Sequence, residues 1–312
     1  MTGLRDFDSQ ITMALAHLGI AGARLLGRGG EGTVYEFSDD RVVKIYRQGN
    51  EGELQRLATF QEMLSRQGFP FRTPQILEIG RVDETLFTIE PRLPGATLAG
   101  RFSSLSEDQQ RMALTNYYAA LRLINEVELP DYAYGHVLPT EDYPGGAATW
   151  IDFLDTQLDR SLEKAGADLA QDVEAFEEKA QELRQLLHRH AEGSPKRFVH
   201  GDYFLDNVLF DDTLQVAAVL DFGAHTLAGD PRLDATSAII FLGLESAMKP
   251  WSFAYGTALA QEHYGDSILP LIDIYALYYA MYFANTKLTM PGDYDWCVRA
   301  WNDPQRWQSA RQ

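Results

Sequence analysis

The sequence has a single cysteine, Cys297, in 312 residues. This chain therefore cannot build an internal disulfide or a cysteine-based zinc site, and so little cysteine is typical of proteins in a reducing cytoplasm. Long apolar segments are also lacking, because charged residues interrupt the most hydrophobic stretch, at 269–288. The first ten residues carry charges where a signal peptide would be apolar. We therefore expect a cytoplasmic protein without a membrane partner.

Basic residues are scarce: 27 Lys and Arg stand against 45 Asp and Glu, a formal net charge of −18. Such a chain repels phosphate polymers, so we expect no nucleic-acid partner. The imbalance is uneven. Residues 1–95 hold 11 basic and 13 acidic residues, whereas residues 96–312 hold 16 and 32. The acidic part would suit a cationic ligand, although acidity that serves only solubility explains it equally simply.

The pattern of hydrophobic and turn residues divides the chain into two parts. Residues 1–94 alternate in the manner of short antiparallel strands, with helices at 6–19 and 53–65, and the segment Pro91–Gly95 breaks the pattern. The rest is mainly helical, with helices expected at 106–126, 149–165 and 169–190 and from 234 onward, and with short strands near 197–220. We predict an α+β fold of two lobes: a small antiparallel-sheet lobe, 1–94, and a larger, mainly helical lobe, 95–312.

Residues 27–34 match the pattern G-x-G-x-x-G-x-V, with Gly27, Gly29, Gly30, Gly32 and Val34 at its fixed positions. Glycine allows backbone amides to approach a phosphate closely, because no Cβ intervenes. A dinucleotide-binding turn would have to open a helix, whereas the residues that follow alternate and are β-branched, which favours a strand. An ordinary glycine hairpin remains the simplest alternative for this segment taken alone.

Lys44 ends the segment Val42-Val43-Lys44, ten residues after Val34. In strand periodicity it lies on the same face as Val42, toward the side of the glycine turn, where a lysine can neutralise nucleotide phosphates. Such a lysine needs an anionic partner to hold it. Glu53, early in the next predicted helix, is the first candidate, and Glu51 and Glu62 are alternatives.

The most informative segment is 199–209, which contains H-x-D-x-x-x-x-N and is followed at 221–223 by Asp-Phe-Gly. Asn207 and Asp221 supply two oxygen ligands of the kind that Mg²⁺ shares with phosphates. Asp202 would then orient an acceptor hydroxyl and accept its proton. Any one of these residues alone would be an ordinary loop residue; their joint spacing, with the glycine loop and Lys44 upstream, indicates a kinase-like site.

These motifs resemble the aminoglycoside phosphotransferase and choline kinase-like family of small-molecule kinases, which share the protein-kinase fold. The resemblance spans about residues 20–240 and includes 229–234, which reads G-D-P-R-L-D. It implies a hinge at 90–95, where backbone groups of about Glu90 and Arg92 would bind adenine. It also implies ATP or GTP and Mg²⁺ as cofactors. One departure is the run Tyr203–Asp206, which replaces a shorter filling in relatives and puts the substrate side in doubt.

The resemblance implies transfer of the γ-phosphoryl group of ATP or GTP to a hydroxyl of a small molecule. An aminoglycoside-like or other amine-bearing acceptor would suit the acidic second part; amino alcohols, homoserine and sugars are alternatives within the family. A catalytically silent nucleotide-binding regulator is a further alternative. A protein kinase is disfavoured, because no A-P-E follows and only a short stretch separates Gly223 from Asp230. The sequence does not indicate an oligomeric state.

Overall fold

The computed structural model describes residues 3–98, 100–140, 143, 145–242 and 249–312. The chain forms two compact units. The first comprises residues 1–96, 209–212 and 216–223, and the second comprises 97–208, 213–215 and 224–312. The first unit thus ends two residues beyond the predicted boundary and takes in two later segments, which the sequence pattern did not indicate. None of the helices in the described ranges is long and apolar enough to cross a membrane.

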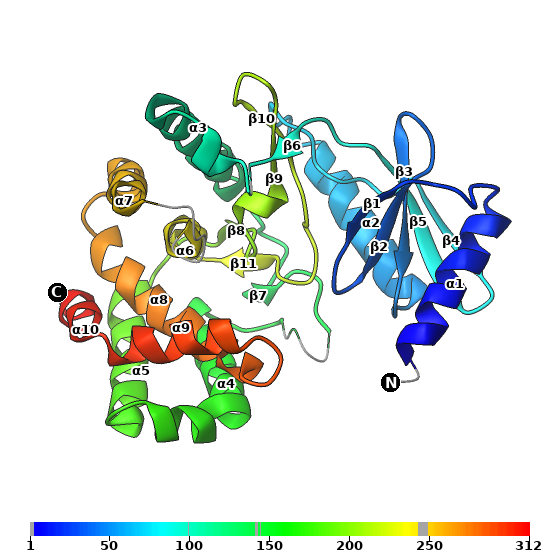
Figure 1. The fold of residues 1–312 in the computed structure, drawn as a ribbon. Coiled ribbons are helices and arrows are strands. Elements are labelled where there is room, and N and C mark those ends of the chain that lie inside the picture. The colour runs from blue at the N-terminus through cyan, green and yellow to red at the C-terminus, as the bar shows by residue number, and fades with distance from the viewer. Residues whose placement is uncertain (1–2, 99, 141–142, 144, 243–248) are drawn as a thin grey trace. The chain divides into compact units, whose positions relative to one another are not determined.

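The first unit is built on a five-stranded antiparallel sheet with strand order β1-β2-β3-β5-β4 (Figure 1). Its elements are α1 (Gly3–His17), β1 (Leu25–Arg28), β2 (Gly32–Glu36), β3 (Arg41–Tyr46), α2 (Glu51–Ser65), β4 (Glu78–Val82) and β5 (Thr85–Pro91). Helix α2 connects β3 to β4, and Asn50 caps its first turn by accepting a hydrogen bond from the Glu53 N–H. The predicted antiparallel lobe is confirmed.

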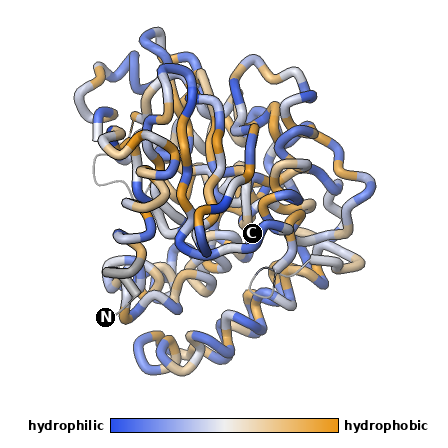
Figure 2. Tube along the Cα trace, turned by 90° about the vertical axis from the view of Figure 1, so that its right-hand side faces the viewer, coloured by the Kyte–Doolittle hydropathy of each residue, from blue (hydrophilic) through white to orange (hydrophobic). Residues whose placement is uncertain are grey.

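The two faces of this sheet differ in character, because side chains alternate along each strand. On one face Val43, Ile45, Phe87 and Ile89 pack against the apolar side of α1. Figure 2 shows hydrophobic stretches along the Cα trace, interrupted by hydrophilic ones. The opposite face carries Lys44 and Tyr46 of β3, and Lys44 lies opposite Thr88 of β5 in the register. This polar face holds the candidate nucleotide-binding residues.

Short strands continue where the chain passes from one unit to the other. They are β6 (Ala96–Thr97), β9 (Val208–Phe210) and β10 (Val216–Val219), in the order β10-β9-β6. The N–H of Arg72 donates to the carbonyl of Ala217 over 2.9 Å, and the N–H of Val219 donates back to Arg72 over 3.0 Å. These bonds attach β10 to the loop that precedes β4.

The second unit is mainly helical, as predicted. Its helices are α3 (Glu107–Asn125), α4 (Trp150–Asp172), α5 (Phe176–Ala191), α6 (Arg232–Leu242), α7 (Pro250–Tyr264), α8 (Ile268–Phe283), α9 (Pro291–Asn302) and α10 (Pro304–Ala310). Its described residues also form the 3₁₀ turns η1 (Phe102–Ser104), η2 (Leu205–Asn207) and η3 (Ala284–Thr286) and the strands β7 (Gly135–His136), β8 (Arg197–Val199) and β11 (Leu227–Gly229). Tyr275, Tyr278 and Tyr279 of α8, together with Trp301 and Trp307, are buried in its core, as expected of packing residues.

One helix boundary in the second unit was predicted wrongly. The sequence analysis placed a break between 165 and 169, whereas α4 continues to Asp172 and the chain turns at Val173–Ala175. Ala175 adopts a left-handed conformation with φ of 51°, which a non-glycine residue seldom does. No glycine or proline marks this turn, so the local sequence carried no signal for it.

Candidate functional site

The loop after β8 makes its turn at Gly201, between His200 and Asp202. Gly201 has φ of +79°, and a Cβ added there would lie 2.0 Å from the carbonyl oxygen of His225. Any residue other than glycine is disfavoured at this position for two reasons. The left-handed conformation strains a residue with a Cβ, and the space that the Cβ would need is filled. The glycine is therefore required by the fold of the loop itself.

Asp234, on the first turn of α6, holds the backbone of this loop through hydrogen bonds. Its carboxylate accepts hydrogen bonds from the N–H of His200 over 2.6 Å and of Gly201 over 2.9 Å. It also accepts one from Asn125 Nδ2 over 2.9 Å. Asp234 is fully buried, and burial raises its pKa while these donors act to lower it. The last residue of the G-D-P-R-L-D segment thus fixes the backbone of the candidate catalytic loop.

Asp202 and Asn207 face each other across the 3₁₀ turn η2. Asn207 Nδ2 donates to the Asp202 carbonyl over 2.9 Å and to its Oδ2 over 3.1 Å. Because both amide hydrogens point to Asp202, the Asn207 Oδ1 oxygen is turned the other way. The N–H of Asp202 points to His200 Nδ1 at 3.3 Å, which orients the loop further. The arrangement holds a half-buried carboxylate in one orientation beside an amide oxygen.

The unusual run after Asp202 serves to anchor the loop. Tyr203 is fully buried, and its hydroxyl donates to the Tyr117 carbonyl over 2.9 Å while the Tyr117 hydroxyl donates back to the Tyr203 carbonyl. Phe204 stacks on Phe241 with ring centroids 3.9 Å apart. These residues therefore join the loop to α3 and α6. The sequence analysis left their role open, and only their hydrophobic character hinted at this packing.

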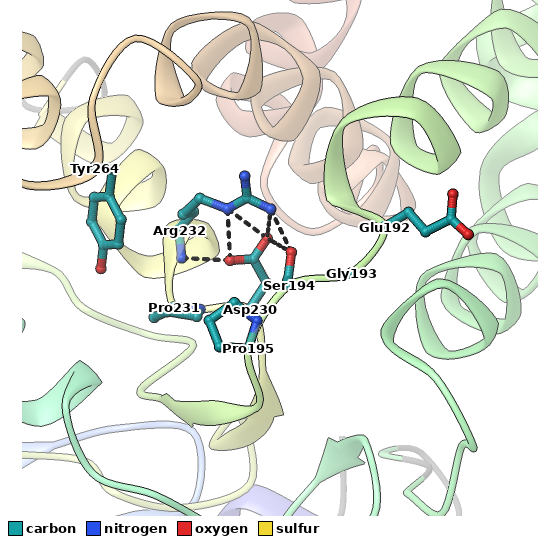
Figure 3. A pocket seen from close by; sticks show the side chains of 8 residues that line it. All are labelled: Glu192, Gly193, Ser194, Pro195, Asp230, Pro231, Arg232 and Tyr264. Atoms are coloured by element: carbon teal, nitrogen blue, oxygen red, sulfur yellow. Dashed lines mark hydrogen bonds and ion pairs between the residues drawn. The ribbon is translucent and has the colours of Figure 1, made fainter.

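Asp230 and Arg232 form a largely buried ion pair (Figure 3). Asp230 is fully buried, and the Arg232 guanidinium bonds to both of its carboxylate oxygens. Ser194 and the Tyr275 hydroxyl also donate to Asp230 Oδ2, over 2.8 and 3.1 Å. Because both Asp230 carboxylate oxygens are hydrogen-bonded, we interpret this cluster as a structural support. The motif at 229–234 was recognised in the sequence, but this supporting role was not predicted.

Asp221 belongs to the first unit, after β10, and has φ of +60°. A non-glycine residue in the left-handed region is uncommon, and such strain gathers at functional sites because the surroundings must maintain it. Its side chain is exposed, in contrast to the neighbouring Phe222, which is buried. Asp83, Ala175 and Leu214 share this conformation, so the motif rather than the backbone angle marks Asp221 as a candidate.

Lys44 is held by a different residue from the one expected. Its Nζ lies 2.6 Å from Glu31 Oε2, and Glu31 belongs to the glycine loop. Among the described ion pairs Glu51 contacts Arg81 and Glu62 contacts Arg66, and the Lys44 pair is formed by neither these nor Glu53. The prediction considered only acidic residues in or near the following helix, whereas the register of β2 and β3 brings the glycine loop, and Glu31 with it, close to Lys44.

The surroundings of Lys44 are polar and partly buried. Lys44 lies over the Tyr46 ring at 5.0 Å, and Thr88 Oγ1 donates to Glu90 Oε1 over 2.7 Å on the same face of the sheet. Burial alone would lower the pKa of Lys44, but Tyr46 and Glu31 raise it and the net shift is upward. Burial also raises the pKa of Glu90. Lys44 is thus a stable cation beside two carboxyl groups.

The glycines of the loop fall into two groups. A Cβ at Gly32 would lie 2.2 Å from the Ile45 carbonyl oxygen, so the pairing of β2 with β3 requires glycine there. At Gly27, Gly29 and Gly30 an added Cβ would meet nothing within 4 Å, and no positive φ demands glycine. Gly27 lies within β1, so the turn itself is shorter than predicted. Neither the backbone conformation nor the packing around these three positions therefore requires glycine. Val34, the last position of the pattern, lies in β2 opposite Lys44 in the register.

The residues of the predicted hinge lie at the end of β5, beside β3. The Arg92 N–H donates to the Asp40 carbonyl over 2.8 Å, and its guanidinium pairs with Glu36 over 2.6 Å. Glu90 is paired with Val42 in the ladder, and hydrogen-bonded pairs alternate along antiparallel strands, so its backbone groups face β3 as well. The backbone of Glu90 and the N–H of Arg92 are thus engaged in contacts with β3 and the turn before it.

The described residues contain no cluster of three or more His, Cys, Asp or Glu side chains that could hold a metal ion. The predicted magnesium ligands are one carboxylate and one amide oxygen, a set that depends on phosphate oxygens to complete it. The Asn207 amide fits this role, because its oxygen is turned away from Asp202. The donor chemistry therefore suits Mg²⁺ bound together with a nucleotide.

Comparisons with known proteins identify the family and the fold. Residues 22–264 match the family described as the phosphotransferase enzyme family. Among solved structures, the streptomycin–ATP complex of APH(2″)-IIa has a TM-score of 0.63 at 15% identity and covers 95% of this chain and 99% of its own. Macrolide 2′-phosphotransferase MphH from Brachybacterium faecium has a TM-score of 0.58 at 14% identity and covers 96% and 99%.

The complex of APH(2″)-IIIa with GDP and kanamycin gives a TM-score of 0.62 at 15% identity, covering 94% of this chain and 95% of its own. At these identities the likeness shows the fold alone. The comparison with curated proteins found no match.

Proposed function

Since the chain belongs to the phosphotransferase enzyme family, we propose that it transfers the γ-phosphoryl group of ATP or GTP to a hydroxyl group of a small molecule. The observation that carries this proposal is the Asp202–Asn207 pair on a loop fixed by Asp234. Phosphoryl transfer needs positioning and charge neutralisation rather than covalent help, and a rigid loop provides the positioning.

In this proposal Asp202 receives the acceptor hydroxyl. Asn207 Nδ2 occupies Oδ2 of Asp202, which leaves Oδ1 to accept a hydrogen bond from the hydroxyl. As the acceptor oxygen bonds to the γ-phosphorus, its proton passes to Asp202 and the bond from that phosphorus to the leaving nucleotide diphosphate breaks. Asp234 acts only through the loop, by holding the N–H groups of His200 and Gly201, so it is a positioning residue.

The remaining groups bind the nucleotide. Lys44 would bind phosphate oxygens, which would replace Glu31 as its anionic partner. The backbone amides of the loop near Gly30 would donate hydrogen bonds to the same phosphates. Asn207 Oδ1 and Asp221 would hold Mg²⁺, which neutralises the phosphate charge when bound. Glu53 remains a prediction for a partner of Lys44 in the nucleotide-bound enzyme. For the hinge, the alternation of backbone groups along β5 would give the adenine contacts to the Pro91 carbonyl and the Leu93 N–H rather than to the predicted Glu90 and Arg92.

For the acceptor we propose an amine-bearing molecule. Residues 96–312 carry twice as many acidic as basic residues, which favours a cationic ligand over a neutral one. Structural neighbours were solved with streptomycin, gentamicin and kanamycin, all of them aminoglycosides. One neighbour is a macrolide phosphotransferase, so the fold also accommodates other acceptors. Amino alcohols, homoserine and sugars therefore belong in the same screen.

The proposal is tested by coupled ADP and GDP release with these acceptor classes, using wild type, Asp202→Ala and Asp206→Ala. Asp206 is the matched control, because it lies four residues on in the same loop with its side chain exposed. We expect Asp202→Ala to lower kcat by about 10²–10⁴-fold, the usual contribution of a positioned base, with nucleotide affinity unchanged.

Asp206→Ala should retain turnover. Full activity of Asp202→Ala would remove Asp202 from the mechanism. Saturable nucleotide binding without release of diphosphate to any acceptor would instead favour a silent regulator.

A further inference from the structure

Two tyrosines join helix α3 to the candidate catalytic loop, which runs from Asp202 to Asn207. Tyr117 and Tyr203 are buried, with 1% and 0% of their surface exposed, and their ring centroids lie 4.5 Å apart. The hydroxyl of each residue donates a hydrogen bond to the backbone carbonyl of the other. Because Tyr203 directly follows Asp202 in the chain, these bonds act on the backbone next to the candidate base.

The two hydrogen bonds differ in what they hold. Tyr117 is an interior residue of α3, where each carbonyl accepts from the N–H four residues on, so the Tyr203 hydroxyl is a second donor to its carbonyl. Tyr203 lies outside the helices and strands, so no helical or sheet ladder supplies a donor to its buried carbonyl, and the Tyr117 hydroxyl does. The bond from Tyr117 is therefore the one that fixes the loop.

The peptide group between Tyr203 and Phe204 carries this constraint to the candidate site. Its carbonyl and its N–H lie in one plane and point in opposite directions. The carbonyl accepts from Tyr117, and the N–H donates to the Asp202 carbonyl over 3.1 Å. That Asp202 carbonyl also accepts from Asn207 Nδ2 over 2.9 Å, and the same Nδ2 donates to Asp202 Oδ2 over 3.1 Å. The plane of one peptide thus determines how the Asn207 amide meets the Asp202 carboxylate.

The Tyr117 hydroxyl keeps its proton. Burial raises the pKa of Tyr117 far above the usual value of a tyrosine, and the negative charges of Asp234 and Asp202 add to the rise. A hydroxyl that does not ionise remains a hydrogen-bond donor and exchanges no proton with reacting groups. Its effect on turnover would therefore come from position rather than from acid–base chemistry.

We propose, on the basis of the phosphotransferase function above, that Tyr117 is a positioning residue for Asp202. Its hydroxyl sets the orientation of the peptide between Tyr203 and Phe204, and this peptide aligns the Asn207 amide with the Asp202 carboxylate. Loss of the hydroxyl lowers kcat, because a displaced base fails in the transition state. The KM for nucleotide changes much less, because most of the proposed nucleotide contacts belong to the first unit.

The kinetic test compares Tyr117→Phe with Tyr118→Phe in the diphosphate-release assay. Tyr118 is the matched control, since it is the next residue of α3, is 8% exposed, and donates to the Ala235 carbonyl of α6 over 3.5 Å rather than to the loop. We expect Tyr117→Phe to lower kcat by about ten- to a hundredfold, with the KM for nucleotide within about twofold of wild type. Tyr118→Phe should retain both values. The loss in Tyr117→Phe should not vary with pH, because the hydroxyl does not titrate.

Hydrogen exchange tests the same alignment without turnover, by NMR of protein labelled at the phenylalanine and glycine nitrogens. The Phe204 N–H should exchange about tenfold faster in Tyr117→Phe than in wild type, the effect of one lost buried hydrogen bond. The Gly201 N–H, which Asp234 holds, should exchange at the wild-type rate. A general loss of stability would instead accelerate both groups.

Wild-type kcat in Tyr117→Phe, an unchanged Phe204 exchange rate, or equal acceleration of Phe204 and Gly201 would overturn the inference. If Tyr117→Phe does not fold, Tyr203→Phe takes its place, because it removes the reciprocal hydroxyl and keeps the ring. Its kcat should fall by about two- to fivefold, and wild-type kcat and exchange there would also overturn the inference.

A wild-type protein without turnover on any acceptor would contradict the phosphotransferase proposal itself. The exchange rates of Phe204 and Gly201 would still decide whether Tyr117 aligns the loop, so the two failures are distinguishable.

Discussion

The two units hold their candidate functional groups by different means. In the second unit Asp202 stands on a loop whose backbone bonds to a fully buried carboxylate, and whose tyrosine is locked to α3. In the first unit Lys44 pairs with Glu31, whose side chain is 54% exposed, and three of the loop glycines meet open space. The candidate catalytic loop is thus preorganised by its own packing, whereas in the first unit Lys44 is held by a partly exposed partner that, in the proposed function, a phosphate would replace.

Among the variants that test this difference between the two units, Gly201→Ala should have the largest effect on stability and turnover. The added Cβ collides with a backbone oxygen at +79° φ, so we expect a loss of about 2–5 kcal/mol in the free energy of unfolding and loss of turnover. The matched control is Gly193→Ala, because Gly193 has φ of +72° and nothing within 4 Å. Left-handed strain alone costs about 1–2 kcal/mol there. Denaturant unfolding compares the two, and equal losses would contradict the tight loop.

Gly29→Ala tests the open glycine loop of the first unit. The structure leaves room for the methyl group and requires no positive φ, so stability should stay the same or rise by about 0.4–1 kcal/mol. Nucleotide binding should weaken by about tenfold if phosphates approach this backbone. Gly22→Ala, equally open but outside the loop, should change neither quantity. Calorimetric titration with nucleotide measures the affinity of each variant. Unchanged affinity in Gly29→Ala would indicate that the segment is an ordinary hairpin.

Glu31→Gln removes the charge that competes with phosphates for Lys44. We expect the KM for nucleotide to fall by roughly two- to fivefold, in keeping with the strength of a partly exposed ion pair. Glu62→Gln breaks an exposed pair with Arg66 on α2, where the carboxylate side chain is also 54% exposed, and should leave the KM unchanged. A higher KM in Glu31→Gln would mean that Glu31 positions Lys44 for the nucleotide rather than competing with it.

Glu90→Gln should have the smallest effect, and one that depends on pH. Burial raises the pKa of the Glu90 carboxyl in the folded protein above its value in the unfolded chain. The stability that the protonated carboxyl contributes is therefore fully present below the unfolded-state pKa and is lost as pH rises through the folded-state pKa. The variant and the wild type should therefore be alike near pH 4, and the variant should gain relative stability toward pH 7. Thermal unfolding across this range checks the sign, and a relative loss toward neutral pH would show that the pairing of Glu90 with Lys44 outweighs burial.

The sequence predicted most of the fold because its signals were local. Alternating residues marked β2 and β3, and the joint spacing of His200, Asp202 and Asn207 indicated the catalytic loop. The errors arose where a partner lies far along the chain or where no turn residue marks a bend. Glu31 reached Lys44 through the strand register, and the break at Ala175 carries no glycine or proline.

The sequence by itself determined the family, the α+β class and the identity of the candidate catalytic residues, because these depend on residue types at fixed spacing along the chain. Only the tertiary structure decided which residues support them. Asp234, Asn125 and Tyr117 reach the loop from helices far away in sequence, and their roles follow from buried hydrogen bonds. Such bonds form only where packing excludes water and brings distant donors and acceptors together, so spacing alone cannot reveal them.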